Sequence, residues 1–211
     1  MSGQRKRHRI FLRLLLSYMI ILVIPISVWI LTYVRTVSVV RDEVIHANLA
    51  ILNQGKAVLD RRFDEIRQIV TQLLQDHKVD SFQYLREPFT GSNAYKVLDL
   101  EHNLHDYSIS NNFISDYFIF FQNSDLVMSS NRTYKSSYFY SSYFQYGQMD
   151  YGSWRQLMLA PYHQNEYFPA ATVTIQGRQR EMVVYAQSLG RPDRHHGAVM
   201  VLIDDEEIRK L

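Results

Sequence analysis

The sequence predicts an α+β protein, in which an N-terminal transmembrane helix and a long amphipathic helix precede an antiparallel sheet flanked by helices. Three observations support this prediction. They are an uncharged stretch of membrane-spanning length, a helical repeat of apolar residues directly after it, and short runs of β-forming residues in the second half. The chain has 211 residues, which leaves enough for one domain beyond the two helices.

The transmembrane helix is predicted over Leu14–Val34, which contains no charged residue. These 21 residues would form a helix of about 31 Å, close to the roughly 30 Å hydrocarbon core of a bilayer. Basic residues at Arg5–Arg9 and Arg13 precede the helix, which predicts a cytoplasmic N-terminus and an extracellular remainder. A cleaved signal peptide is the alternative, but its apolar core is typically about 7–15 residues long.

A long extracellular helix is predicted over residues 35–78, because apolar residues recur there at steps of three and four. The first half of this stripe is close to a heptad repeat, so we expect it to pair with a second copy and form a homodimer. The second half is expected to pack on the domain that follows. The stripe consists of Val37, Val40, Val44, Ala47, Ile51, Val58, Phe63, Ile66, Val70 and Leu73.

The domain itself is predicted over residues 79–203, and residues 204–211 begin a further helix. Aromatic and β-branched runs indicate strands, and clusters of Gly, Pro, Asn and Ser indicate loops. The expected elements are a loop (80–93), a helix (94–105), strands (116–121 and 126–129), a loop with a short helix at 138–146, a helical turn (153–159), a loop (161–169), strands (170–175 and 181–189), a polar loop (190–197) and a last strand (198–203).

Composition excludes several classes of function. The chain has no cysteine, so it forms neither disulfides nor thiolate metal sites. Its net charge is only +2 and much of the basic excess lies in residues 1–13, so the exported part is not a basic nucleic-acid binder. His102 and His105 share a helix face but lack a third ligand, and no metal site is predicted. No catalytic motif is present, so we expect no enzyme activity and no cofactor.

Three segments carry a family resemblance: FLRLLLSYMIILVIPISVWIL, NLAILNQGKAVLDRRFDEIRQIVTQLLQDHKV and GAVMVLIDDEEIRKL. They are similar to membrane-anchored AraC-type transcriptional regulators of Gram-positive bacteria, and the input regions of some sensor histidine kinases begin in a similar way. The element order resembles their extracellular Cache domain, a PAS-like antiparallel sheet flanked by helices. The resemblance implies an N-terminal portion of a longer receptor. DNA binding, or kinase activity in the alternative, would belong to a part beyond Leu211.

The resemblance also implies a ligand site, because Cache ligands lie against the sheet, under the segments between its second and third strands. An aromatic belt falls in that region, and rings with a polar rim suit a sugar or an amino acid, free or carried by a binding protein. The alternatives are that the rings form the core or a partner surface, as in a membrane-tethered adaptor. The expected ligand-binding residues are Arg132, Tyr134, Tyr143, Trp154, Arg155 and Tyr185.

Overall fold

The computed structural model describes residues 3–130 and 132–210. The first two residues of the predicted tail and the last residue of the predicted final helix lie outside the described residues. The chain divides into two compact units, Met1–Lys56 and Ala57–Leu211. The long helix predicted from the apolar stripe belongs to both units.

The first unit consists of the N-terminal part of helix α1 (Gly3–Gln75). Every side chain from Phe11 to Gln54 is exposed, and an 18-residue window within the helix has a mean hydropathy of 2.6. The helix is therefore long and apolar enough to span a membrane. The hydroxyl of Thr32 donates to the carbonyl oxygen of Val28 at 2.8 Å, so it needs no partner outside the helix.

Helix α1 ends at Gln75, slightly before the predicted limit at residue 78. The reason is Asp76, whose backbone is extended and whose carboxylate accepts a hydrogen bond from the backbone N–H of Lys78 at 2.7 Å. This contact caps a separate helix, α2 (His77–Phe82). Two further helices follow, α3 (Asn93–Asn103) and α4 (Tyr107–Ser110), the first of them close to its predicted position.

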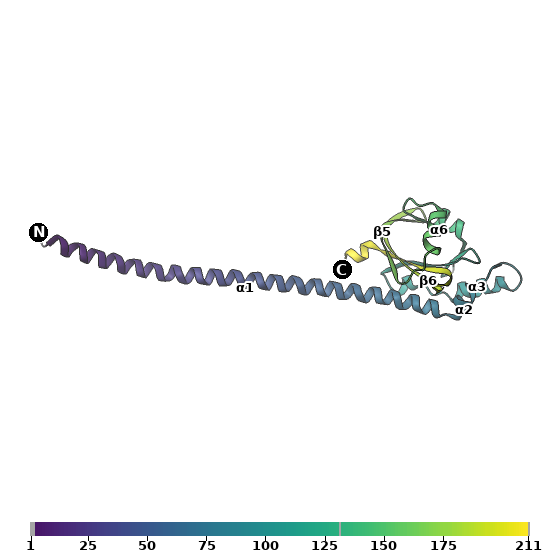
Figure 1. The fold of residues 1–211 in the computed structure, drawn as a ribbon, viewed down its shortest axis with the longest axis horizontal. Coiled ribbons are helices and arrows are strands. Elements are labelled where there is room, and N and C mark those ends of the chain that lie inside the picture. Colours follow the sequence, from purple (N-terminus) through teal and green to yellow (C-terminus); the bar gives the residue numbers. More distant parts are fainter. Residues whose placement is uncertain (1–2, 131, 211) are drawn as a thin grey trace. The chain divides into compact units, whose positions relative to one another are not determined.

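The second unit contains a curled antiparallel sheet of seven strands in the order β3-β2-β1-β7-β6-β5-β4 (Figure 1). The prediction of an α+β fold with an antiparallel sheet is confirmed. The strands are β1 (Ile114–Phe121), β2 (Leu126–Ser129), β3 (Arg132–Lys135), β4 (Phe144–Tyr146), β5 (Glu166–Ile175), β6 (Arg178–Arg191) and β7 (Arg194–Asp204).

Alternate residues of the central strands fill two cores on opposite faces of the sheet. The helix-side cluster includes Ile119 of β1 and receives Ile66, Val70 and Leu73 from α1, which confirms that the second half of the stripe packs on the domain. The opposite face carries the aromatic cluster. Its largest side chains are Phe118, Phe120, Phe139, Tyr140, Tyr143, Phe144 and Trp154.

Two short helices contribute buried side chains to the aromatic cluster: η1 (Phe139–Tyr143), which is a π-helix, and α6 (Tyr151–Leu159). The one-turn helix α5 (Ser136–Tyr138) directly precedes η1. Figure 1 shows α6 on one side of the sheet, away from α1. A final helix, α7 (Asp205–Arg209), follows β7, as the acidic run after the last predicted strand indicated.

Three of the predicted loops are wrong in part. The loop at 161–169 gives way to β5 at Glu166, because Pro169 lies within a register irregularity of the strand, where a proline needs no ladder hydrogen bond. The loop at 190–197 shrinks to Pro192 and Asp193. Residues 129–152 contain β3 and β4, and their short helices occupy 136–143 instead of 138–146.

Candidate functional site

A polar network in the second unit joins Asp116, Arg132 and Tyr143. Arg132 donates from Nη1 to Oδ2 of Asp116 at 3.0 Å and to the hydroxyl oxygen of Tyr143 at 2.5 Å. That hydroxyl in turn donates to Oδ2 of Asp116 at 3.3 Å, and the guanidinium carbon lies 5.7 Å from the centre of the tyrosine ring. The three side chains come from β1, β3 and η1, so the network joins segments that are distant in sequence.

An irregularity in β1 accompanies this placement of Asp116. The register between β1 and β7 shifts between Ile114 and Asp116, so Ser115 is an extra residue in the strand. Such bulges locally re-aim the side chains beside them. Both Ser115 and Asp116 line the same pocket, although neighbouring residues of a regular strand point to opposite faces.

The pocket has a volume of about 200 Å³ and lies between β1, β3, η1 and the hairpin of β5 and β6. Besides Asp116 and Arg132, its charged residues are Arg178 and Arg180, both from β6. Arg180 lies 3.4 Å from a carboxylate oxygen of Asp204. Within residues 3–130 and 132–210, Arg178 forms no ion pair, so its guanidinium is available to a ligand.

Burial and charge act in opposite directions on Asp116. Burial raises the pKa of this carboxyl, while the backbone N–H of Tyr117, the Arg132 guanidinium and the Tyr143 hydroxyl each lower it, and burial is the larger effect. Burial and the nearby Asp116 charge together raise the pKa of Tyr143 to about 12. The tyrosine hydroxyl therefore keeps its proton at neutral pH and remains a donor to Asp116.

The structure brings three of the predicted ligand residues together. Arg132 and Tyr143 line the pocket, and the ring of Tyr134 lies 5.3 Å from that of Tyr143. Arg155 lies on α6, partly exposed.

Trp154 and Tyr185 lie elsewhere. Trp154 is 2% exposed and stacks on Phe120 at 5.4 Å within the aromatic cluster, where its Nε1 has no hydrogen-bond partner among the described residues. Tyr185 lies in the helix-side cluster, on the opposite face of the sheet from Trp154, and its hydroxyl donates to Oδ1 of Asn165 at 2.7 Å.

Sequence reasoning missed Asp116, Arg178 and Arg180 as site residues. A signal for Asp116 existed, because it is the one acid at the start of an otherwise aromatic and apolar strand run. The two arginines alternate in the sequence Arg-Gln-Arg and would share one face of a strand, but the sequence predicts Arg178 as the last residue of a turn at 176–178, and the structure begins β6 there. Their proximity to Arg132 depends on the curl of the sheet, which no local pattern reveals.

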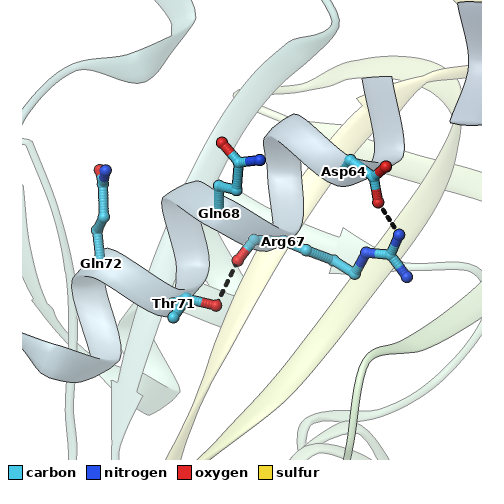
Figure 2. A pocket seen from close by; sticks show the side chains of 5 residues that line it. All are labelled: Asp64, Arg67, Gln68, Thr71 and Gln72. Atoms are coloured by element: carbon cyan, nitrogen blue, oxygen red, sulfur yellow. Dashed lines mark hydrogen bonds and ion pairs between the residues drawn. The ribbon is translucent and has the colours of Figure 1, made fainter. Parts of the chain in front are cut away.

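A polar hollow of about 360 Å³ lies along α1, lined by Asp64, Arg67, Gln68, Thr71 and Gln72 (Figure 2). Arg67 pairs with Asp64, and the Thr71 hydroxyl donates to the carbonyl oxygen of Arg67 at 2.7 Å. All of its lining residues come from one helix and are exposed, as expected for a solvated face. This hollow therefore offers no enclosed site.

Another hollow, of about 600 Å³, lies at the far end of β6, and its lining includes Arg191, Arg194, Asp80 and Tyr84. Within the described residues, no group of three or more His, Asp or Glu side chains is arranged to hold a metal ion. His102 is exposed, and its Nδ1 lies 2.8 Å from the carbonyl oxygen of Leu98 in its own helix.

No family model matches the chain, and no curated protein is significantly similar to it.

Proposed function

We propose that this chain is the extracytoplasmic signal-sensing portion of a membrane-bound transcriptional regulator of the AraC type. One observation carries the proposal. A single helix, α1, contains the apolar stretch of membrane-spanning length and also fills one face of the domain that holds the charged pocket. In this proposal the basic N-terminus is cytoplasmic and the second unit is extracellular. DNA binding would belong to a part of the receptor that this chain does not include.

The pocket supplies the input in this mechanism. A small molecule that contacts Arg132, Tyr143 or Arg178 would favour one of two arrangements of the domain, by the difference in its affinity for them. The ligand class we expect is a sugar or an amino acid, either free or delivered by a binding protein.

Helix α1, paired with its copy in a homodimer, would transmit the change in the domain to the membrane span. Val37, Val40 and Val44 are between 49% and 55% exposed, and they continue the apolar stripe beyond the predicted membrane span. Because the same helix packs on the sheet through Ile66 and Val70, a shift of the domain would rotate or slide the helix against its copy.

Cysteine cross-linking in membranes tests this mechanism on the full chain. The natural chain has no cysteine, so each introduced thiol is the only one present. Val44→Cys lies on the stripe, and Asp42→Cys, at about 100° per residue, lies nearly opposite to it. We expect strong disulfide formation at position 44, weak formation at 42, and a change at 44 when a ligand found by thermal-shift screening is added. A monomeric chain, or cross-linking that no ligand alters, would contradict the proposal.

A membrane-tethered adaptor is the second candidate, and exposed apolar side chains favour it. Phe89, Tyr95 and Leu98 are 60%, 71% and 55% exposed and lie on α3 and the loop before it. If the chain is an adaptor, Phe89→Ser should abolish binding of a partner protein, while no small molecule should raise its melting temperature. A sensor histidine kinase would share the input mechanism and differ only in the output.

A further inference from the structure

The charged pocket contains more positive than negative charge. Three arginines (132, 178 and 180) line it, against the single carboxylate of Asp116. Arg132 is already engaged by Asp116 and Tyr143. The cationic surplus therefore lies on β6, at Arg178 and Arg180.

The two β6 arginines are held close together by local geometry. They are two residues apart on one strand, so their side chains leave the same face of the sheet. The strand begins directly after the two-residue turn Gln176–Gly177, in which both residues have positive φ values (49° and 77°). Such a turn fixes the register of a hairpin, and here it pairs Arg178 with Ile175 and Arg180 with Val173. Paired guanidinium groups match the oxygens of a carboxylate or a phosphate.

Arg180 also connects the pocket to the last helix. Asp204 accepts a hydrogen bond from the backbone N–H of Glu206 through Oδ1, at 3.0 Å, and so caps α7. Its other oxygen, Oδ2, faces Arg180 at 3.4 Å, a long contact between side chains that are 52% and 17% exposed. An exposed ion pair of this length contributes little stability, so a competing anion can replace it.

We propose that Arg178 and Arg180 bind the anionic group of a small ligand, a carboxylate or a phosphate, and that the bound anion draws Arg180 away from Asp204. This inference rests on the proposed sensory function and names the ligand chemistry of its pocket. A pocket of about 200 Å³ is smaller than the roughly 300 Å³ minimum typical of drug-sized ligands, so it suits a compact anion.

Release of Arg180 changes the charge at the start of α7. The first turn of this helix already holds Asp205, Glu206 and Glu207, and Asp204 precedes them. Of these four acids, Asp205 and Glu207 are paired with Arg209 and Lys210 within the helix. Without Arg180, the Asp204 side chain keeps, among the described residues, only its capping hydrogen bond to Glu206. Ligand binding in the pocket would therefore change the electrostatic environment of α7, the helix that follows the last strand.

The binding test uses the full chain in lipid nanodiscs with three probes: succinate, inorganic phosphate and neutral succinamide. We expect at least one of the two anions to raise the melting temperature, and succinamide to have no effect. Arg178→Gln should weaken binding of that anion at least tenfold. Arg191→Gln is the matched control, because it removes an exposed arginine from the other end of the same strand, and it should leave the affinity unchanged.

The coupling test uses Asp204→Asn, which keeps a capping oxygen and removes the charge that competes for Arg180. This variant should bind the anion several-fold more tightly. An environment-sensitive dye on Glu206→Cys should respond to the anion in the parent chain and not when Asp204→Asn is also present.

Three results would overturn the inference: equal binding of succinamide, full binding by Arg178→Gln, or loss of binding by Arg191→Gln instead. Failure of both anions would do the same. None of these results contradicts the sensory proposal, which fails if the chain is monomeric or if no small molecule of any charge changes cross-linking at position 44. If Asp204→Asn binds the anion as tightly as the parent chain, and the dye responds to the anion equally in both, the proposed coupling to α7 is wrong.

Discussion

Asp116 is a carboxyl group whose burial in the fold disfavours its charged form. Because burial raises its pKa above the ordinary value of 3.8, the folded protein holds the Asp116 proton to higher pH than the unfolded chain does. A raised folded-state pKa contributes stability below the unfolded pKa, and this contribution is lost as pH rises through the folded pKa.

Asp116→Asn removes this pH dependence. We therefore expect the unfolding free energy of the natural chain, relative to that of Asp116→Asn, to fall as pH rises above 3.8 and then to level off. Urea unfolding of both chains across this range measures the difference. If the difference rises with pH instead, the ion pair with Arg132 outweighs burial and the direction of the pKa shift is wrong.

Gly197 is required by the close approach of β1 and β7. A Cβ atom at this position would lie 2.2 Å from the backbone oxygen of Phe120 and 2.7 Å from Cδ1 of Leu189. Gly197→Ala should therefore destabilise the domain by about 1–3 kcal/mol, as overpacked cores do. Gly152→Ala is a suitable control, because its Cβ would meet only the end of the Asp150 side chain at 3.3 Å. Thermal unfolding of the two variants should separate them clearly, and equal melting temperatures would contradict the crowding argument.

At the scale of elements, His163 holds the connection between α6 and β5. Its ring nitrogens lie 2.5 Å from Oε2 of Glu166 and 2.9 Å from the carbonyl oxygen of Leu157. Its backbone N–H donates to the Ser188 hydroxyl, and its carbonyl oxygen accepts from the Ser188 N–H, both at 2.9 Å. One buried residue thus links α6, β5 and β6.

His163→Ala should lower the unfolding free energy by about 2 kcal/mol, because it removes a buried ring and leaves the partly buried carbonyl oxygen of Leu157 without its donor. The control His102→Ala removes an exposed side chain and should change the unfolding free energy by no more than about 0.5 kcal/mol. Chemical denaturation curves give both values. A loss at His163 no larger than that at His102 would show that the backbone contacts alone hold the connection.

The elements that the sequence predicted best are those with a strong local signal. The strand Leu126–Ser129 has its predicted limits. The turn predicted at residues 176–178 is confirmed for Gln176 and Gly177, whereas Arg178 already begins β6. The strands that it missed, β3 and β4, are short and lie at the two edges of the sheet, where hydrogen bonds to a neighbour matter more than propensity. Residues 190–197 looked like a loop because they are polar, yet the pairing of Arg191 with Arg194 leaves a connection of only two residues.

The candidate site was predictable only in part, for a similar reason. Arg132 and Tyr143 belong to the predicted aromatic belt and lie in the pocket. Asp116 depends on a register shift beside Ser115, and Arg178 depends on how the sheet curls. Both are properties of the assembled sheet and not of any single segment.

At the scale of the whole molecule, the exposed stripe on α1 gives a prediction about hydrogen exchange. Val37, Val44 and Ile51 are 49%, 52% and 67% exposed in a single copy of the chain, and a helix without packing is only marginally stable in water. Amides between residues 37 and 51 should therefore exchange faster than those between 66 and 73, and should become protected as the protein density in nanodiscs rises. Hydrogen–deuterium exchange at two densities measures this. Protection that is the same at both densities would argue against a homodimer through this stripe.

The aromatic cluster has a consequence for spectroscopy. Trp154 is one of only two tryptophans in the chain, and it is buried with the rings of Tyr140 and Phe120 at 5.0 and 5.4 Å. The other, Trp29, is 67% exposed on α1, so Trp29→Phe would leave a single indole in a dry environment. The fluorescence emission of Trp154 should be blue-shifted, and energy transfer from the neighbouring tyrosines should excite it efficiently. Any loosening of the cluster by a ligand would move the emission to longer wavelengths, so the domain carries its own optical reporter.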